Sequence, residues 1–158
     1  MAKVLVIDHE KCTSCRLCEM VCSERHGGAY RPCVSRVRVA IYPEKAVYLP
    51  QTCVQCEDAP CMEVCPSEAL VRDPDTSAVL VVEENCTGCG ACESACPFGA
   101  VHIWDDKAHI CDLCGGDPEC VKFCVPQALR YETPDESVRS AQQAYADHLR
   151  DTLAEVKG

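Results

Sequence analysis

The sequence predicts an α+β fold in which short hairpins and short helices surround four runs of cysteines. We expect two interleaved modules, followed by a C-terminal amphipathic helix. Seventeen of the 158 residues are cysteine, and sixteen of these fall into four runs of four. Short segments of alternating apolar and polar residues lie between the runs, as in β-hairpins. Because aromatic residues make up only 5% of the chain, the apolar core is thin, and groups bound to the cysteines must help to hold the fold.

The expected elements follow the chain in order. An apolar strand, VLVI (residues 4–7), precedes the first run. Short helices should begin within the second, third and fourth runs, at 61–65, 92–96 and 120–124. The three expected hairpins pair residues 36–42 with 46–50, 69–73 with 78–83, and 100–104 with 107–110.

The C-terminal segment reads as a separate amphipathic helix. Thr133 is expected to cap it, with Pro134 at its first position and Glu136 as the acid of a capping box. One apolar stripe recurs at three- and four-residue steps and consists of Val138, Ala141, Tyr145, Leu149, Leu153 and Val156. The stripe either packs on the rest of the chain or docks a catalytic subunit or a second copy. We therefore divide the chain into a double module at 1–131 and a helix at 132–158.

The spacing within the runs points to iron–sulfur chemistry. A C-x2-C-x2-C segment can surround one corner of a cluster, and the x3 step to the last cysteine carries that thiolate away. In bacterial two-cluster proteins this fourth cysteine ligates the other cluster. Pro66 and Pro97 follow their runs as in such proteins, whereas Ser23 and Val125 depart from the pattern. The four runs are Cys12, Cys15, Cys18, Cys22; Cys53, Cys56, Cys61, Cys65; Cys86, Cys89, Cys92, Cys96; and Cys111, Cys114, Cys120, Cys124.

Other uses of the cysteines are disfavoured. A zinc site uses cysteine pairs, often with histidine, but each pair here is followed by a third and a fourth cysteine. A disulfide scaffold needs an oxidising compartment, and the N-terminal residues resemble no export signal. No apolar run is long enough for a membrane span. We therefore expect a cytoplasmic protein with four [4Fe–4S] clusters.

The net charge of −10 disfavours nucleic acid as a partner, because no basic face is available for phosphates. An acidic surface suits docking to a basic patch on another protein. The sequence offers no nucleophile–base pair, phosphate loop or carboxylate dyad, so we do not expect the chain to be an enzyme by itself.

Two observations disagree about which runs belong together. VLVIDHEKCTSC resembles VLVVEENCTGC, which suggests a duplicated unit that pairs the first run with the second and the third with the fourth. The linkers favour another arrangement, because the second and third runs are separated by a single simple hairpin. If those two runs form one module, the first and fourth are left to pair with each other.

The four runs, together with CSERHGGAYRPCVSRVRV, CVQCEDAPCMEVCP and CDLCGGDPECVKFC, resemble a known family. It comprises the four-cluster, ferredoxin-like electron-transfer subunits of molybdenum- and tungsten-pterin oxidoreductases, and the likeness covers residues 1 to about 131. The phrase CDLCGGDP looks most like the small subunit accompanying tungsten aldehyde oxidoreductases. The resemblance implies that outer runs pair with each other and inner runs with each other, each module being like a bacterial ferredoxin.

Carried onto this sequence, the resemblance gives four ligand sets. These are Cys12, Cys15, Cys18, Cys124; Cys22, Cys111, Cys114, Cys120; Cys53, Cys56, Cys61, Cys96; and Cys65, Cys86, Cys89, Cys92.

The resemblance also implies a function and partners. The chain would pass electrons between a large tungsten- or molybdenum-pterin aldehyde oxidoreductase subunit and a flavin- or NAD-linked subunit or a ferredoxin. The alternatives are an electron-transfer subunit of a formate dehydrogenase or hydrogenase complex, a free-standing polyferredoxin and, in a different class, a zinc-binding interaction scaffold.

Cys33, which lies outside the four runs, is expected to be a buried apolar thiol. Ordinary structural roles are expected for His26, His102, His109 and Trp104.

Overall fold

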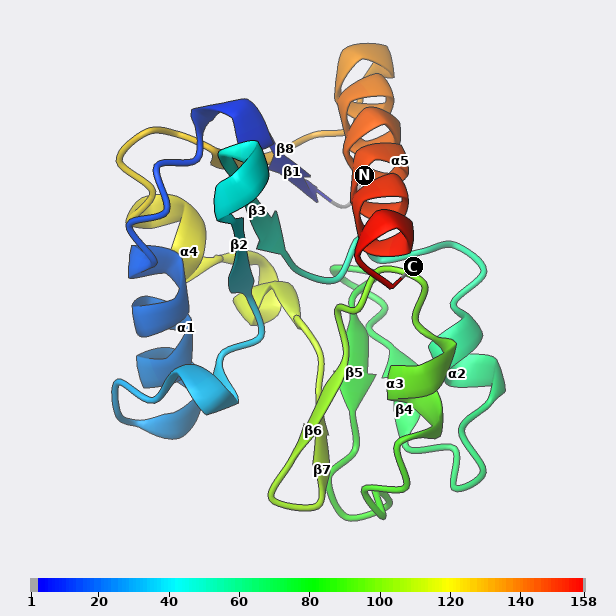
Figure 1. Cartoon of the computed structure of the whole chain (residues 1–158). Helices are drawn as coiled ribbons and strands as arrows, with labels where there is room; N and C mark the ends of the chain where they lie inside the picture. Colours follow the sequence, from blue (N-terminus) through cyan, green and yellow to red (C-terminus); the bar gives the residue numbers. More distant parts are fainter. Residues whose placement is uncertain (1–2, 158) are drawn as a thin grey trace.

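The computed structural model describes residues 3–157 and confirms the α+β class. Within that part of the chain, four antiparallel two-stranded sheets are combined with five α-helices (Figure 1). Four short 3₁₀ segments lie between them: η1 (His9–Lys11), η2 (Pro32–Val34), η3 (Pro43–Lys45) and η4 (Leu113–Gly116). Among the described residues, no helix combines the length and the hydropathy that crossing a membrane would require.

Two sheets and two helices carry the first and fourth runs. β1 (Val4–Ile7) pairs with β8 (Leu129–Glu132), and the expected hairpin forms from β2 (Arg38–Tyr42) and β3 (Val47–Gln51). Helix α1 (Leu17–Gly27) packs against α4 (Glu119–Lys122), so the first run lies beside the fourth. We call residues 3–52 and 111–132 the outer segments.

The second and third runs lie together in the other part of the molecule, residues 53–110, which we call the inner segment. The two expected hairpins are present as β4 (Leu70–Arg72) with β5 (Val79–Val81) and β6 (His102–Trp104) with β7 (Lys107–His109). Helices α2 (Pro60–Glu63) and α3 (Ala91–Ala95) pack against each other. Figure 1 shows these elements on one side of the molecule, with α1, α4, β2 and β3 on the other.

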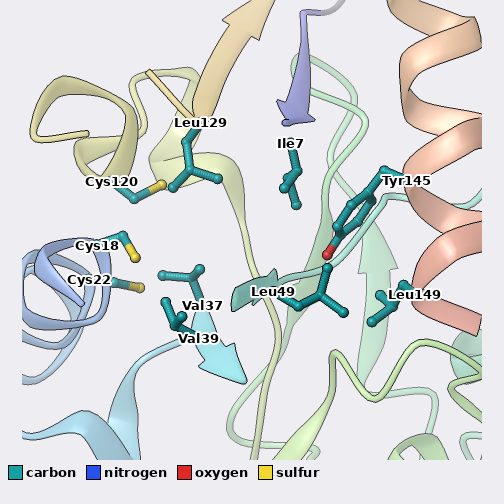
Figure 2. Close-up of a cluster of buried hydrophobic side chains, with 10 residues drawn as sticks. All are labelled: Ile7, Cys18, Cys22, Val37, Val39, Leu49, Cys120, Leu129, Tyr145 and Leu149. Atoms are coloured by element: carbon teal, nitrogen blue, oxygen red, sulfur yellow. The ribbon is translucent and has the colours of Figure 1, made fainter. Parts of the chain in front are cut away.

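The buried side chains form separate clusters in the outer segments and in the inner segment. One cluster, shown in Figure 2, joins elements of the outer segments to the C-terminal helix and consists of Ile7, Cys18, Cys22, Val37, Val39, Leu49, Cys120, Leu129, Tyr145 and Leu149. A second belongs to the inner segment and consists of Cys53, Ala59, Cys61, Leu70, Val79, Cys92, Ala100, Val101, Ala108 and Ile110. Phe98 packs against both. Cysteines are therefore part of each core.

Helix α1 continues past the last cysteine of its run, unlike the other three run helices. Helices α2, α3 and α4 each end before the fourth cysteine of their runs, whereas Cys22 lies within α1. Ser23, which stands where proline is expected, is fully buried. Its Oγ donates to the Met20 carbonyl (2.8 Å) and accepts from the Arg31 backbone N–H (3.1 Å). Because serine keeps its own N–H, the helix can run on to Gly27, and the hydroxyl then anchors the following linker.

The C-terminal helix α5 (Glu136–Lys157) begins later than predicted, and the assignment of Thr133 as its N-cap is wrong. Asp135 is the cap: its Oδ1 accepts from the Val138 backbone N–H (2.8 Å), and its carbonyl accepts from Arg139 N–H (3.0 Å). An aspartate three residues before Val138 has the spacing of a cap. Pro134 and the predicted capping-box pair of Thr133 and Glu136 therefore do not open the helix.

The apolar stripe of α5 packs on the rest of the chain. Val138, Tyr145 and Leu149 are buried, and Leu153 packs against the outer core. The Tyr145 hydroxyl donates to the Pro50 carbonyl, which ties the helix to β3. The side chain of Val156, predicted to continue the stripe, lies outside the described residues. This part of the stripe is consequently not free to dock a catalytic subunit or a second copy, which corrects the docking alternative.

Candidate metal centres

Three hollows in the structure are each lined by four of the predicted cysteines. The linings of the three hollows contain Cys12, Cys15, Cys18, Cys124; Cys53, Cys56, Cys61, Cys96; and Cys65, Cys86, Cys89, Cys92. Each lining draws three thiols from one run and the last thiol from another run.

The remaining four cysteines also lie close together. The pKa of Cys120 is raised by burial and then by the neighbouring thiols of Cys111, Cys22 and Cys114. Cys22 from α1 and Cys120 from α4 belong to the same buried cluster (Figure 2). We number the four sets by their place along the molecule: set 1 contains Cys12, set 2 contains Cys22, set 3 contains Cys53 and set 4 contains Cys65.

Backbone N–H groups point at the last cysteine of every run. Cys65 Sγ accepts from Ala69 N–H at 3.3 Å and Cys96 Sγ from Ala100 N–H at 3.4 Å. The sulfurs of Cys124 and Cys22 accept from Leu129 N–H (3.4 Å) and Arg36 N–H (3.2 Å). Such donors favour the negative charge of a thiolate and tune a bound cluster.

In each run, a residue with a positive φ angle turns the backbone sharply within the cysteine loop. Ser14, Gln55, Gly88 and Cys114 all have positive φ angles and lie within or between the C-x2-C steps. At Gly88 a side chain has no room, because an added Cβ would lie 2.6 Å from the Asp106 carbonyl oxygen in the β6–β7 turn. Close packing of that turn thus fixes the loop that carries Cys86 and Cys89.

Burial keeps several of the thiols protonated in the absence of metal. It raises the pKa of Cys18 to about 12 and those of Cys92 and Cys111 to about 11. Metal binding must therefore displace protons from these thiols. The metal–sulfur bonds have to be strong enough to offset the cost of deprotonating them. The donor set, thiols arranged in fours with N–H groups aimed at sulfur, fits [4Fe–4S] clusters.

Thiols of successive sets raise one another's pKa, and we call this order of neighbours, from set 1 to set 4, the row. The thiol of Cys18 in set 1 acts on the pKa of Cys120 in set 2, and Cys111 of set 2 acts on Cys53 of set 3. Cys61 of set 3 acts in turn on Cys92 of set 4. Among the cysteines that the structure describes, the exposed ones are Cys15 in set 1 and Cys89 in set 4. Both ends of the row therefore reach the surface.

Three polar side chains surround set 2: Arg36 and Asp112, which were not identified from the sequence, and His26, for which an ordinary structural role was expected. Arg36 Nη1 forms an ion pair with Asp112 Oδ2 (2.6 Å), and Asp112 Oδ1 accepts from Cys114 N–H (2.9 Å). His26 Nε2 lies 3.8 Å from the Cys114 sulfur. Burial and the nearby Arg36 lower the pKa of His26 to about 4, so His26 is neutral at pH 7 and adds no charge.

Gln55 joins the outer and inner parts of the molecule. Its side-chain amide donates to the Cys111 carbonyl (2.6 Å), and its Oε1 accepts from Val79 N–H (2.9 Å). His102 makes a second connection, because its Nε2 lies 3.0 Å from the Cys33 carbonyl oxygen. Cys33 is half-buried and lines none of the three hollows. Trp104 is half exposed.

Comparisons with known proteins decide the family. Residues 44–134 match the 4Fe-4S dicluster domain family, and residues 5–23 match a 4Fe-4S binding domain. The chain belongs to the 4Fe-4S dicluster family. It is 48% identical over 123 residues to the "aliphatic sulfonate oxidoreductase, polyferredoxin-like subunit" of Pyrococcus furiosus, covering 76% of this chain and 70% of the relative.

Two further proteins are also similar to this chain. Identity to "electron transport protein HydN" of Escherichia coli is 32% over 154 residues, which cover 82% of this chain and 87% of the relative. A solved chain of the "active site complex BamBC of Benzoyl Coenzyme A reductase in complex with Benzoyl-CoA" has a TM-score of 0.50 and 26% identity, covering 98% of this chain and 96% of that one. This dicluster protein is therefore a ferredoxin-like, non-catalytic electron-transfer subunit with multiple [4Fe–4S] clusters.

Proposed function

We propose that the four cysteine sets hold one [4Fe–4S] cluster each, with outer runs sharing two clusters and inner runs sharing the other two. The observation that carries this proposal is the composition of the hollows, each of which draws three cysteines from one run and one from another. A bound cluster of this type accepts and releases single electrons. Residues 1–131 would then be the double cluster-binding module, and 132–158 the helix that covers it.

The row of cysteine sets suggests where electrons enter and leave. Cys15 and Cys89 are exposed at opposite ends of the row, so a partner can approach set 1 or set 4 closely. Set 2 of the outer segments and set 3 of the inner segment are joined where the Gln55 side chain donates to the Cys111 carbonyl. The protein's own contribution is to hold the sets in this order and to direct N–H donors at their sulfurs.

We further propose that the partner at one end is a large tungsten- or molybdenum-pterin subunit of an aldehyde oxidoreductase. The family resemblance supports this choice. A relative named as the polyferredoxin-like subunit of an aliphatic sulfonate oxidoreductase supports a catalytic partner in general, without favouring an aldehyde as the substrate. Formate dehydrogenase and hydrogenase complexes are the alternative partners. A free-standing carrier is the second candidate function, favoured by a relative that is named only as an electron transport protein.

Anaerobic affinity purification of the tagged full chain from its native cells tests the partner. We expect co-purification of a larger subunit, with tungsten or molybdenum in amounts near one per complex by metal analysis. A chain that elutes alone in size exclusion, brown and fully loaded with iron, would support the free carrier. A colourless, iron-free preparation containing zinc would contradict the cluster assignment itself.

A further inference from the structure

The inner segment has an unusual charge balance. Residues 53–110 contain eleven acidic residues and two basic ones, Arg72 and Lys107. Ten of the eleven acids are exposed, and Asp73 is half-buried. Water screens exposed charges strongly, so the acids act only weakly on the interior. Both bases, in contrast, are half-buried.

Each of the two bases is directed at the backbone of a different cysteine set. Arg72 Nη2 donates to the Cys56 carbonyl (2.7 Å) and also to the Glu57 carbonyl (3.3 Å). Lys107 Nζ donates to the carbonyls of Cys86 and Glu83, both at 2.7 Å. Cys56 belongs to set 3 and Cys86 to set 4, so each inner set has one cation against its own loop.

The charge of these two cations is not offset by a paired carboxylate. Among the described residues, neither Arg72 nor Lys107 forms a salt bridge, whereas six of the ten bases in the outer segments do. Carbonyl oxygens satisfy the N–H groups without cancelling the charge. Although Arg36 lies beside set 2, its charge is compensated by Asp112. The inner sets therefore have unpaired cations beside their ligands.

From this geometry we infer that Arg72 and Lys107 set the reduction potentials of the two inner clusters, Arg72 for set 3 and Lys107 for set 4. Reduction adds one electron, and thus one negative charge, to a cluster. A fixed cation nearby stabilises the reduced form more than the oxidised form, which raises the potential. The inference rests on the proposed assignment of clusters to sets. Both side chains are positioning residues, since their contacts are with the carbonyls of cysteine loops.

Charge and hydrogen bonding can be separated by pairs of variants. Arg72→Gln and Lys107→Gln remove the charge, whereas Arg72→Lys and Lys107→Arg keep it. Lys45→Gln is the control, because it removes the same charge at an exposed ion pair with Glu155, away from the inner segment. The full chain is reconstituted anaerobically, its iron is counted, and the clusters are titrated with dithionite while EPR spectra are recorded.

We expect each neutral variant to move one cluster to a more negative midpoint potential, and a different cluster in each case. The charge-conserving variants and Lys45→Gln should retain wild-type potentials. If the neutral variants lose iron while the charge-conserving variants keep it, the requirement for charge at these positions is supported.

Three results would overturn the inference. They are wild-type potentials in an iron-loaded neutral variant, equal shifts in the neutral and charge-conserving variants, and loss of iron from both kinds of variant. Failure of the cluster assignment is distinguishable, because the wild-type chain itself would then lack the expected EPR signals.

Discussion

The outer segments and the inner segment carry cysteine runs of similar spacing but surround them with different side chains. The outer core contains large side chains, among them Leu49, Leu129, Tyr145 and Leu149, and is covered by α5. The inner core consists of three cysteines, three alanines and four branched aliphatic residues. Because small side chains bury little apolar area, the inner segment depends more on what its thiols bind.

The charges differ in the same way. Outer bases mostly form ion pairs, whereas the two inner bases are directed at cysteine carbonyls. One cysteine spacing can therefore be placed in two electrostatic environments within a single chain. In this chain, ligand spacing indicates which group is bound, and the residues around the ligands distinguish the two regions.

Removal of iron should have the largest effect and should separate the two regions. Chelation under reducing conditions removes the bonds between the buried thiols and the clusters. Because these bonds stabilise the fold, we expect the metal-free chain to lose its cooperative unfolding transition. We expect hydrogen exchange of the metal-free chain to show no protection in β4–β7, with partial protection left in α5 and β3. Equal protection in both regions would contradict the comparison. Reconstitution with iron and sulfide should restore the native pattern.

Leu149→Ala tests the larger outer core. Leu149 is fully buried between α5 and the body, and such truncations cost about 2–5 kcal/mol. Unfolding of the iron-loaded chain by denaturant measures the loss. Gln143→Ala on the exposed face of α5 is the matched control, with an expected change within about 0.5 kcal/mol. A similar loss in both variants would mean that α5 does not stabilise the body through its stripe.

Ser23→Ala tests the anchor of the outer linker. The variant removes the hydrogen bonds that the Ser23 hydroxyl makes with the Met20 carbonyl and the Arg31 N–H, at about 0.5–1.5 kcal/mol each. Ser94→Ala on α3 is the control, because Ser94 is exposed. Equal unfolding midpoints for the two variants would show that the hydroxyl does not anchor the linker.

Gly88→Ala tests the packing of the inner segment and should have the smallest effect of the series. A methyl group there meets the Asp106 carbonyl, and φ is +66°. Gly90 has a φ of +78°, but nothing lies within 4 Å of an added Cβ, so Gly90→Ala measures the backbone strain alone. We expect Gly88→Ala to be less stable than Gly90→Ala by about 1 kcal/mol in thermal unfolding. Equal melting temperatures of the two variants would show that the β6–β7 turn does not pack closely enough on Gly88 to exclude a side chain.

Much of the local structure could be predicted from the sequence. The three hairpins followed from alternation of apolar residues, and the three short helices from the x3 steps of their runs. The β1–β8 pair was not predicted, because Val4 and Glu132 lie at opposite ends of the double module and no local pattern links them. The cap of α5 was placed two residues early, since Thr133 and Asp135 are both acceptable N-caps and only the Asp135 contacts decide.

The cysteine ligands of the sites could be predicted more readily than the side chains that surround them. Sixteen cysteines in four runs indicate clusters directly, but the internal repeat and the linkers suggested different partners for each run. Arg72 and Lys107 could have been noticed as the lone bases of an acidic segment. Their contacts with Cys56 and Cys86 depend on how the hairpins fold back on the runs, which spacing alone does not specify.

We propose that each cluster takes its fourth thiolate from another run, and thiol labelling of Cys124→Ser can detect this sharing. The iron-loaded variant and the wild type are alkylated anaerobically, and each cysteine is then quantified by mass spectrometry. We predict strong new labelling of Cys12, Cys15 and Cys18, whose hollow Cys124 completes, with Cys111, Cys114 and Cys120 still protected. New labelling of Cys111, Cys114 and Cys120 instead, with Cys12, Cys15 and Cys18 protected, would mean that each run is self-contained and would contradict the account.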